Sequence, residues 1–270
     1  MAIRYEQPED HIVLITIDRP PRNALDMYAF RDLAGAWRTF RDDPDAWVAV
    51  VTGSGDSFCV GADLKTYIPQ ITQLSQDISA GNVTEIDGCK LSDGTFAVLR
   101  PPKVRIYKPI VAAVNGFCTA GGMEMLCGTD IRLASPDAQF AVMEPKRGLF
   151  AGGGTTVRLP RQLPFPLAME LLLTADLVPA ERALAMGLIN EIVSKDRLVD
   201  AALDLARRIA ANAPLAVQAT KESVLRGLAA DYLAALEIET ELAQKIFATE
   251  DAKEGPKAFA EKRPPVWQGR

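Results

Sequence analysis

The sequence reads KPIVAAVNGFCTAGGME at residues 108–124, and this stretch decides the fold. The apolar run at residues 110–114 predicts a strand over residues 110–115 that is buried on both faces of a parallel sheet. A glycine-bearing turn follows at residues 116–122, and residues 123–129 predict a turn of helix. A strand that leads through a glycine turn into a helix is typical of an α/β core.

The segments on either side extend this alternation of strands and helices. Further apolar runs predict strands at residues 12–18, 46–52, 131–134 and 139–142. Asp26 is a suitable N-cap for a helix that runs to about residue 41. Residues 66–107 mix polar residues with glycine and proline, and they predict a short helix followed by a mobile loop. Helical periodicity then predicts helices at residues 155–162, 166–173, 179–186, 197–211, 214–228, 232–249 and 252–261.

The composition is that of a globular protein with a sizeable core. Of the 270 residues, 48% are hydrophobic and 24% are charged. The net charge of -5 and the pI of about 5.1 argue against nucleic acid as the main partner. Residues 1–10 carry no secretory signal, and no apolar stretch is long enough to span a bilayer, so we expect no membrane partner. Four cysteines without a C-x-x-C pair indicate reduced thiols and a cytoplasmic location.

Histidine is nearly absent, which restricts the chemistry. His11 is the single histidine, so a Ser-His-Asp triad or a multi-histidine metal site would depend on this one residue. We therefore expect no metal site, and we expect carboxylates, lysines or tyrosines to carry acid–base chemistry. A dinucleotide loop is not matched either, because Phe58 occupies the third glycine position of G-x-G-x-x-G.

Four groups of residues stand out by their order along the chain. The first is FCVGADL at residues 58–64, and the second is residues 108–116 followed by AGGME at residues 120–124. The third comprises AQF at residues 138–140, Glu144 and GGGT at residues 152–155; the fourth comprises FATED at residues 247–251 and AFAEKR at residues 258–263. In order and spacing, this set resembles the enoyl-CoA hydratase family, also called the crotonase superfamily.

The resemblance implies a fold, a division of the chain and a ligand. The implied fold is an α/β spiral of repeated strand–strand–helix units, with residues 1–195 as the catalytic core. Residues 196–270 would form a helical trimerisation region, and trimers of this family often pair into hexamers. The implied ligand is an acyl-CoA thioester, and no cofactor is expected beyond the coenzyme A that belongs to the substrate.

The family holds the thioester carbonyl between two backbone N–H groups, which correspond to those of Ala62 and Gly121. Addition of a nucleophile at Cβ, or loss of a proton at Cα, places enolate-like charge on that carbonyl oxygen. Each backbone donor aimed at such charge is worth on the order of 10²–10³ in rate. Gly121 and Gly122 open a helix, so its positive end also faces the oxygen, and glycine lets a ligand approach closely.

The family's two catalytic glutamates correspond to Glu124 and Glu144. Two carboxylates around one water suit syn hydration of a trans-2-enoyl thioester, because close carboxylates separate their pKa values. The resemblance assigns Glu144 as the acid that protonates Cα and Glu124 as the base that orients water. Gly152 corresponds to the family glycine whose N–H helps to hold that water.

Coenzyme A binding is implied for residues at both ends of the chain. The corresponding positions are Arg22, Ala24, Ala62, Asp63, Leu64 and Lys65, and, from a neighbouring subunit, Lys262 near Phe259. The solvated face of a helix is an equal interpretation of Lys262.

Two departures leave the substrate and the reaction open. Residues 66–107, which normally shape the acyl pocket, form a long segment, and residues 142–147 around Glu144 are unusually charged. An isomerase, decarboxylase, hydrolase or dehydratase acting on another acyl-CoA is therefore an alternative to hydration. A third possibility is an RNA-binding or non-catalytic relative, against which both glutamates and the low pI argue.

Overall fold

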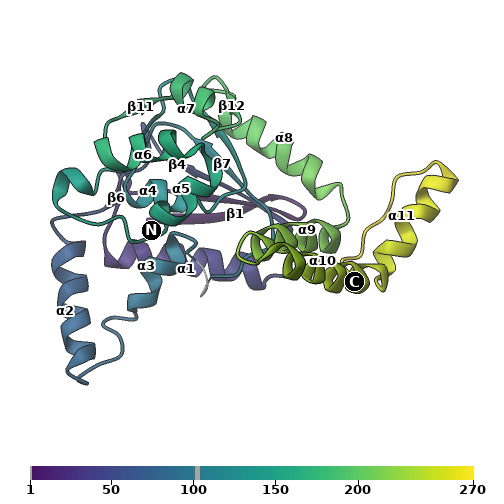
Figure 1. Ribbon diagram of the computed structural model, residues 1–270, viewed down its shortest axis with the longest axis horizontal. Coiled ribbons are helices and arrows are strands. Elements are labelled where there is room, and N and C mark those ends of the chain that lie inside the picture. Colours follow the sequence, from purple (N-terminus) through teal and green to yellow (C-terminus); the bar gives the residue numbers. More distant parts are fainter. Residues whose placement is uncertain (1, 101–103) are drawn as a thin grey trace.

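The computed structural model describes residues 2–100 and 104–270, and a mixed sheet of six strands forms its centre (Figure 1). In spatial order the strands are β1 (Ile3–Glu9), β2 (Ile12–Ile17), β4 (Val48–Gly53), β7 (Ile110–Val114), β9 (Ile131–Ala134) and β12 (Glu191–Ile192). The β1–β2 hairpin is antiparallel, and every later pairing is parallel. Every residue of β4 and β7 is buried, as expected of central parallel strands.

A smaller sheet and a short pair of strands complete the β structure. The smaller sheet has the order β11 (Val178–Pro179), β10 (Gln139–Ala141), β8 (Phe117–Thr119) and β5 (Ser57–Cys59), and the pair joins β3 (Ala24–Leu25) to β6 (Gly61–Ala62). Residues of both sheets, such as Val51 and Phe140, share the main hydrophobic core. The chain passes from β4 to β5, from β7 to β8 and from β9 to β10, so the predicted strand–strand–helix spiral is confirmed.

Helices cover both faces of the six-stranded sheet. On one face α1 (Met27–Asp42) packs into the main core, and Asp26 caps it as predicted by accepting a hydrogen bond from the Ala29 N–H. On the other face α8 (Leu198–Ala210) packs Leu198 and Leu203 into a second hydrophobic cluster, which contains strand residues such as Val50 and Val111. Thus α8 belongs to the body of the protein, although we assigned residues from 196 onward to the C-terminal region.

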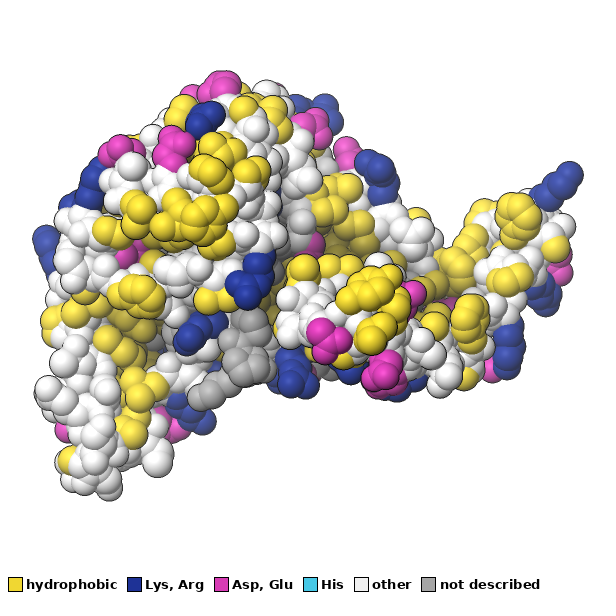
Figure 2. Space-filling view, in the orientation of Figure 1, with side chains coloured by type: hydrophobic (Ala, Val, Ile, Leu, Met, Phe, Trp, Pro, Cys, Tyr) yellow, Lys and Arg dark blue, Asp and Glu magenta, His cyan; other side chains and the backbone are white. Residues whose placement is uncertain are grey.

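The remaining helices include two that pack beside α1 and three that form a C-terminal arm. They are α2 (Tyr67–Ser79), α3 (Leu91–Ala97), α4 (Gly121–Leu126), the 3₁₀ helix η1 (Pro145–Arg147), α5 (Thr155–Gln162), α6 (Phe165–Thr174), α7 (Ala180–Met186), α9 (Pro214–Gly227), α10 (Tyr232–Phe247) and α11 (Glu250–Glu261). Helices α9 and α10 pack together, and α11 stands away from the body (Figure 1). Apolar side chains such as Leu233 and Phe247 are exposed on this arm, whose surface carries many hydrophobic groups (Figure 2).

Several elements differ from the prediction, among them the strand β8 at residues 117–119, where we predicted a turn. Residues 3–9 form β1, although their polar composition predicts no strand. The segment at residues 66–107 contains a second helix, α3, where we predicted a mobile loop; residues 101–103 of that segment lie outside the described part. Among the described residues, no helix is long and apolar enough to cross a membrane.

Candidate active site

A cavity of about 570 Å³ brings Glu124 and Glu144 together. One side, which we call the carboxylate wall, consists of Val60, Ala62, Thr119, Ala120, Gly121, Glu124, Met143, Glu144, Gly152 and Gly153. The other side, the α2–α3 wall, consists of Leu64, Tyr67, Ile68, Leu91, Gly94, Thr95, Val98 and Arg100. Phe30, Arg147, Leu149 and Phe150 complete the lining, and Figure 2 shows hydrophobic side chains in the hollow beside α2. This volume lies within the usual range for small-molecule sites.

Two backbone segments meet at the centre of the carboxylate wall. A Cβ on Gly61 would lie 2.6 Å from the Gly121 nitrogen, so only glycine permits this approach. The Asp63 N–H donates to the Leu25 carbonyl at 2.8 Å, so the preceding N–H, that of Ala62, points to the opposite side of the strand. Gly121 is the first residue of α4, where an N–H has no partner within the helix. This geometry suits the predicted oxyanion hole of Ala62 and Gly121.

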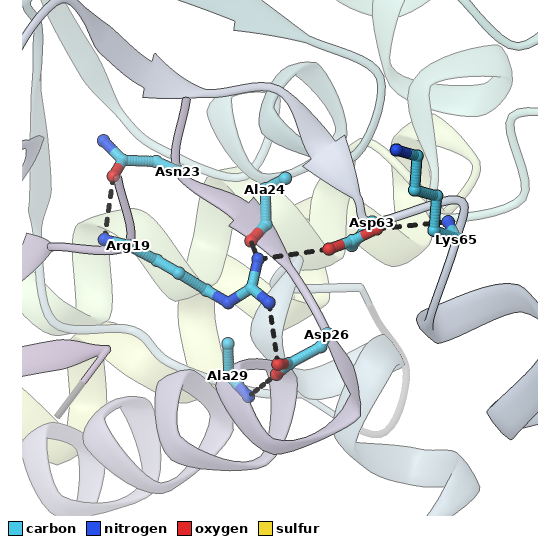
Figure 3. A network of polar contacts seen from close by, with 7 residues as sticks. All are labelled: Arg19, Asn23, Ala24, Asp26, Ala29, Asp63 and Lys65. Carbon is cyan, nitrogen blue, oxygen red and sulfur yellow. Dashed lines mark hydrogen bonds and ion pairs between the residues drawn. The ribbon is translucent and has the colours of Figure 1, made fainter. Parts of the chain in front are cut away.

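Arg19 holds the strand that carries Ala62 (Figure 3). Its guanidinium donates to the Ala24 carbonyl at 2.5 Å and to Asp63 at 3.3 Å, and it pairs with Asp26 at 2.9 Å. These contacts tie β3, β6 and the start of α1 together. Arg19 therefore supports the predicted coenzyme A segment without lining the cavity.

Glu124 projects from α4 toward a glycine loop. Its carboxylate accepts a hydrogen bond from the Gly153 N–H, and a Cβ on Gly153 would lie 2.1 Å from the same carboxylate. Burial raises the pKa of Glu124, while the Gly153 N–H and the positive charges of Arg100 and Arg158 oppose that rise. Glu124 therefore has a partner that favours its charged form.

Glu144 lies in a different environment, directly before η1. It is 9% exposed, and its Oε2 atom has no hydrogen-bond partner among the described residues. Burial raises the pKa of Glu144 to about 7, and the negative charge of Glu124 adds to the rise. The two carboxyl groups thus differ in the way that an acid and a base require, with Glu144 as the group that retains a proton.

Gly152 lines the cavity, but its N–H donates to the Phe150 carbonyl at 2.9 Å. The N–H that faces a catalytic carboxylate is that of Gly153, one residue later. The predicted role of Gly152 in holding water stays a prediction, because its N–H would first have to leave Phe150. A run of three glycines marks the loop in the sequence, but it does not indicate which N–H faces the site.

The predicted coenzyme A residues fall into two groups. Arg22, Ala24 and residues 62–65 lie around β3 and β6 beside the cavity, where the Arg22 guanidinium stacks 4.6 Å from the centre of the Phe117 ring. Phe259 and Lys262 lie on the C-terminal arm, and Phe259 is 87% exposed. Within one chain α11 lies away from α2, α3 and α4 (Figure 1), whose residues line the cavity, so the two groups do not meet.

Tyr67, Arg100, Arg147 and Gly153 line the cavity, although the sequence alone assigned no role to any of them. Tyr67 packs against Phe30 with 4.5 Å between ring centres. Burial and the charge of Glu124 raise the pKa of the Tyr67 hydroxyl to about 12, so it is a neutral phenol in the α2–α3 wall. For Arg147, the sequence feature that could have indicated a role was the charged segment around Glu144.

Comparison with known proteins identifies the family of the chain. The family model described as enoyl-CoA hydratase/isomerase matches residues 7–270, and the chain belongs to that family. It is 40% identical over 265 residues to "Enoyl-CoA hydratase EchA19" of Mycobacterium tuberculosis, covering 96% of this chain and 94% of that protein. It is 37% identical over 262 residues to "(E)-benzylidenesuccinyl-CoA hydratase" of Thauera aromatica, covering 96% of this chain and 96% of that protein. It is 36% identical over 272 residues to "Carnitinyl-CoA dehydratase" of Citrobacter koseri, covering 96% of this chain and 95% of that protein.

Solved structures show the same architecture. A crystal structure of enoyl-CoA hydratase from M. tuberculosis superposes with a TM-score of 0.84 at 39% identity, over 100% of this chain and 99% of the other. An enoyl-CoA hydratase from Bacillus anthracis gives a TM-score of 0.87 at 27% identity, over 100% of both chains. The crotonase-family fold predicted from the four groups of residues is therefore confirmed.

Proposed function

We propose that the protein is an enoyl-CoA hydratase that adds water reversibly and syn to a trans-2-enoyl-CoA. The observation that carries this proposal is the unequal pair of carboxyl groups in one cavity. Glu124 has an N–H donor that favours its charged form, whereas the pKa of Glu144 is about 7. Relatives named as hydratases at up to 40% identity support the same reaction.

The proposed mechanism uses one water molecule and two proton transfers. Glu124 accepts a proton from water while the water oxygen bonds to Cβ, and the electron pair of the C=C bond shifts toward the thioester oxygen. The N–H groups of Ala62 and Gly121 stabilise the resulting enolate. Glu144 then donates its proton to Cα, which restores the thioester carbonyl. The proton that Glu124 has accepted then returns to Glu144 through the solvent, so water supplies both added hydrogens and the reaction needs no oxidant or reductant.

The paired glutamates provide the test. We expect Glu124→Gln and Glu144→Gln each to lower the hydration of crotonyl-CoA by about 10²–10⁴-fold, since each removes one proton-transfer group. Binding of a saturated acyl-CoA, measured by calorimetry, should change little. Wild-type turnover in both variants would contradict the mechanism. An assay that also offers 3-hydroxyacyl-CoA esters would detect the reverse dehydration, for which carnitinyl-CoA dehydratase relatives are a precedent.

We also propose that the active unit is a trimer, alone or paired. Exposed apolar groups on the arm, such as Leu233 and Phe247, support this assembly because large exposed apolar surfaces mark interaction sites. In the trimer, Phe259 and Lys262 of one subunit would reach the coenzyme A of another. Sedimentation equilibrium should give a mass near three or six chains; the mass of a single chain at micromolar concentration would contradict this assembly.

A further inference from the structure

Two arginines line the cavity that contains the catalytic carboxyl groups. Arg100 follows α3 on the α2–α3 wall, and Arg147 is the last residue of η1. They come from segments that are far apart in the sequence, yet they border one cavity. The neighbouring lining is largely apolar, with Leu91, Val98 and Phe150 among it. Two cations in such a lining require an account.

Two other basic residues near the site have partners. Lys146 pairs with Asp176 at 2.5 Å, and the Arg158 guanidinium donates to the carbonyls of Val98, Leu99 and Glu124. In contrast, neither Arg100 nor Arg147 forms an ion pair with a carboxylate of residues 2–100 and 104–270. Arg147 donates only to the carbonyl of its neighbour Lys146, at 3.3 Å.

The catalytic carboxyl groups do not neutralise these two cations. Glu124 accepts its hydrogen bond from Gly153, and Glu144 has an unpartnered Oε2 atom. The charge of Arg100 acts on Glu124 across the cavity and opposes the rise of its pKa, but the two groups form no ion pair. Both arginines line the cavity and are exposed, so each guanidinium is accessible to a ligand there, and its planar donors match a carboxylate.

The position of the arginines separates them from the predicted coenzyme A segment. Among the residues implied for coenzyme A, Ala62 and Leu64 line the cavity, but the charged ones, Arg22, Asp63 and Lys65, do not. Arg100 instead lies shortly after the end of α3, Arg147 is the last residue of η1, and both line the cavity.

We propose that the acyl group of the substrate ends in a carboxylate, and that Arg100 and Arg147 bind this carboxylate. The substrate class is thus the coenzyme A monothioester of an unsaturated dicarboxylic acid. This inference rests on the proposed hydratase function for its site, but the distal carboxylate takes no part in the addition of water.

Binding of unreactive esters tests the proposal directly. Calorimetry would compare coenzyme A monothioesters of saturated dicarboxylic acids of about six to about eight carbons with monocarboxylic esters of equal length. We expect the dicarboxylic ester to bind at least about tenfold tighter at the best length, because a charge-assisted pair replaces a methyl group. Arg100→Gln and Arg147→Gln should each remove most of this preference and leave the monocarboxylic ester within about threefold.

Lys146→Gln is the matched control, since it removes one positive charge beside Arg147 but outside the cavity lining. It should keep the full preference. Equal affinity for both esters at every length would overturn the proposal. An equal weakening of both esters in the arginine variants would also overturn it, because the arginines would then bind the phosphates of coenzyme A.

Turnover separates this inference from the proposed function. The same pairs of acids would be supplied as trans-2-enoyl esters to the wild-type protein. If both esters are hydrated but neither is preferred in binding, the proposed hydratase function stands and the carboxylate subsite is refuted. If the dicarboxylic ester is strongly preferred in binding but neither ester is hydrated, the proposed hydratase function is refuted and the carboxylate subsite stands.

Discussion

The carboxylate wall and the α2–α3 wall enclose the same cavity, but different groups hold them in place. In the backbone next to the carboxylate wall, a Cβ on Gly122 would lie 2.1 Å from the Cys59 carbonyl oxygen, and one on Gly61 would meet the Gly121 nitrogen. In the α2–α3 wall, a Cβ on Gly94 would meet only the Tyr67 hydroxyl. Backbone cannot yield to an added methyl group, whereas the end of a side chain can. The first wall therefore suits fixed chemistry, and the second suits a variable substrate.

Gly153→Ala should have the largest effect, because it breaks the carboxylate wall at the catalytic base. The added Cβ would lie 2.1 Å from the Glu124 carboxylate, which must move away from the substrate. A displacement of about 1 Å can cost about 10²-fold in rate, so kcat for crotonyl-CoA should fall by about that factor. The neighbouring Gly152→Ala is the control, since its Cβ would meet nothing closer than 3.8 Å. Equal losses in both variants would show that the contact with Glu124 is not the cause.

Arg158→Met tests the connection between the two walls. Arg158 donates to Val98 and Leu99 on one side and to the Glu124 carbonyl on the other. Its loss leaves these carbonyls without a donor, so the free energy of unfolding should fall by about 2 kcal/mol. Urea unfolding measures this change. Arg161→Met, which loses only a bond within its own exposed helix, should stay within about 0.5 kcal/mol of the wild type.

Gly94→Ala adds a methyl group to the α2–α3 wall, as Gly153→Ala does to the carboxylate wall. We expect it to have the smallest effect. Tyr67 can turn aside, so crotonyl-CoA turnover should remain near the wild-type value. Longer acyl chains would meet the displaced ring, and their KM should rise by a factor of about two to five. Steady-state kinetics with esters of increasing length checks this. A loss of crotonyl-CoA turnover as large as that of Gly153→Ala would remove the difference between the walls.

The carboxylate wall was the more predictable of the two. Its glycines and glutamates carry a recognisable pattern, and Glu124 and Glu144 indeed share one cavity. The choice between Gly152 and Gly153 could not be predicted, because it depends on how the loop turns in space. Local pattern also sufficed for elements with strong signals, such as the helix at residues 155–162 and the cap at Asp26.

The α2–α3 wall could not be predicted because distant contacts create it. The Trp37 indole N–H donates to the Ala97 carbonyl at 3.2 Å, and Arg38 pairs with Asp93 at 2.6 Å, so α1 holds α3 in place. Neither contact is visible in the glycine-rich and polar sequence of residues 80–100. Strand β1 was missed for a similar reason, since its pairing with β2 outweighs the polar composition of an edge strand.

The pH dependence of kcat/KM tests the division of labour between Glu124 and Glu144 most directly. Glu144 must hold a proton to deliver it to Cα, and its pKa is about 7, so activity should fall as the pH rises through this value. Glu124 must be charged, so activity should also fall at acidic pH. In Glu144→Gln the weaker residual activity should lose the alkaline decline. An alkaline decline that persists unchanged in Glu144→Gln, or wild-type activity that rises steadily above pH 7, would contradict Glu144 as the acid.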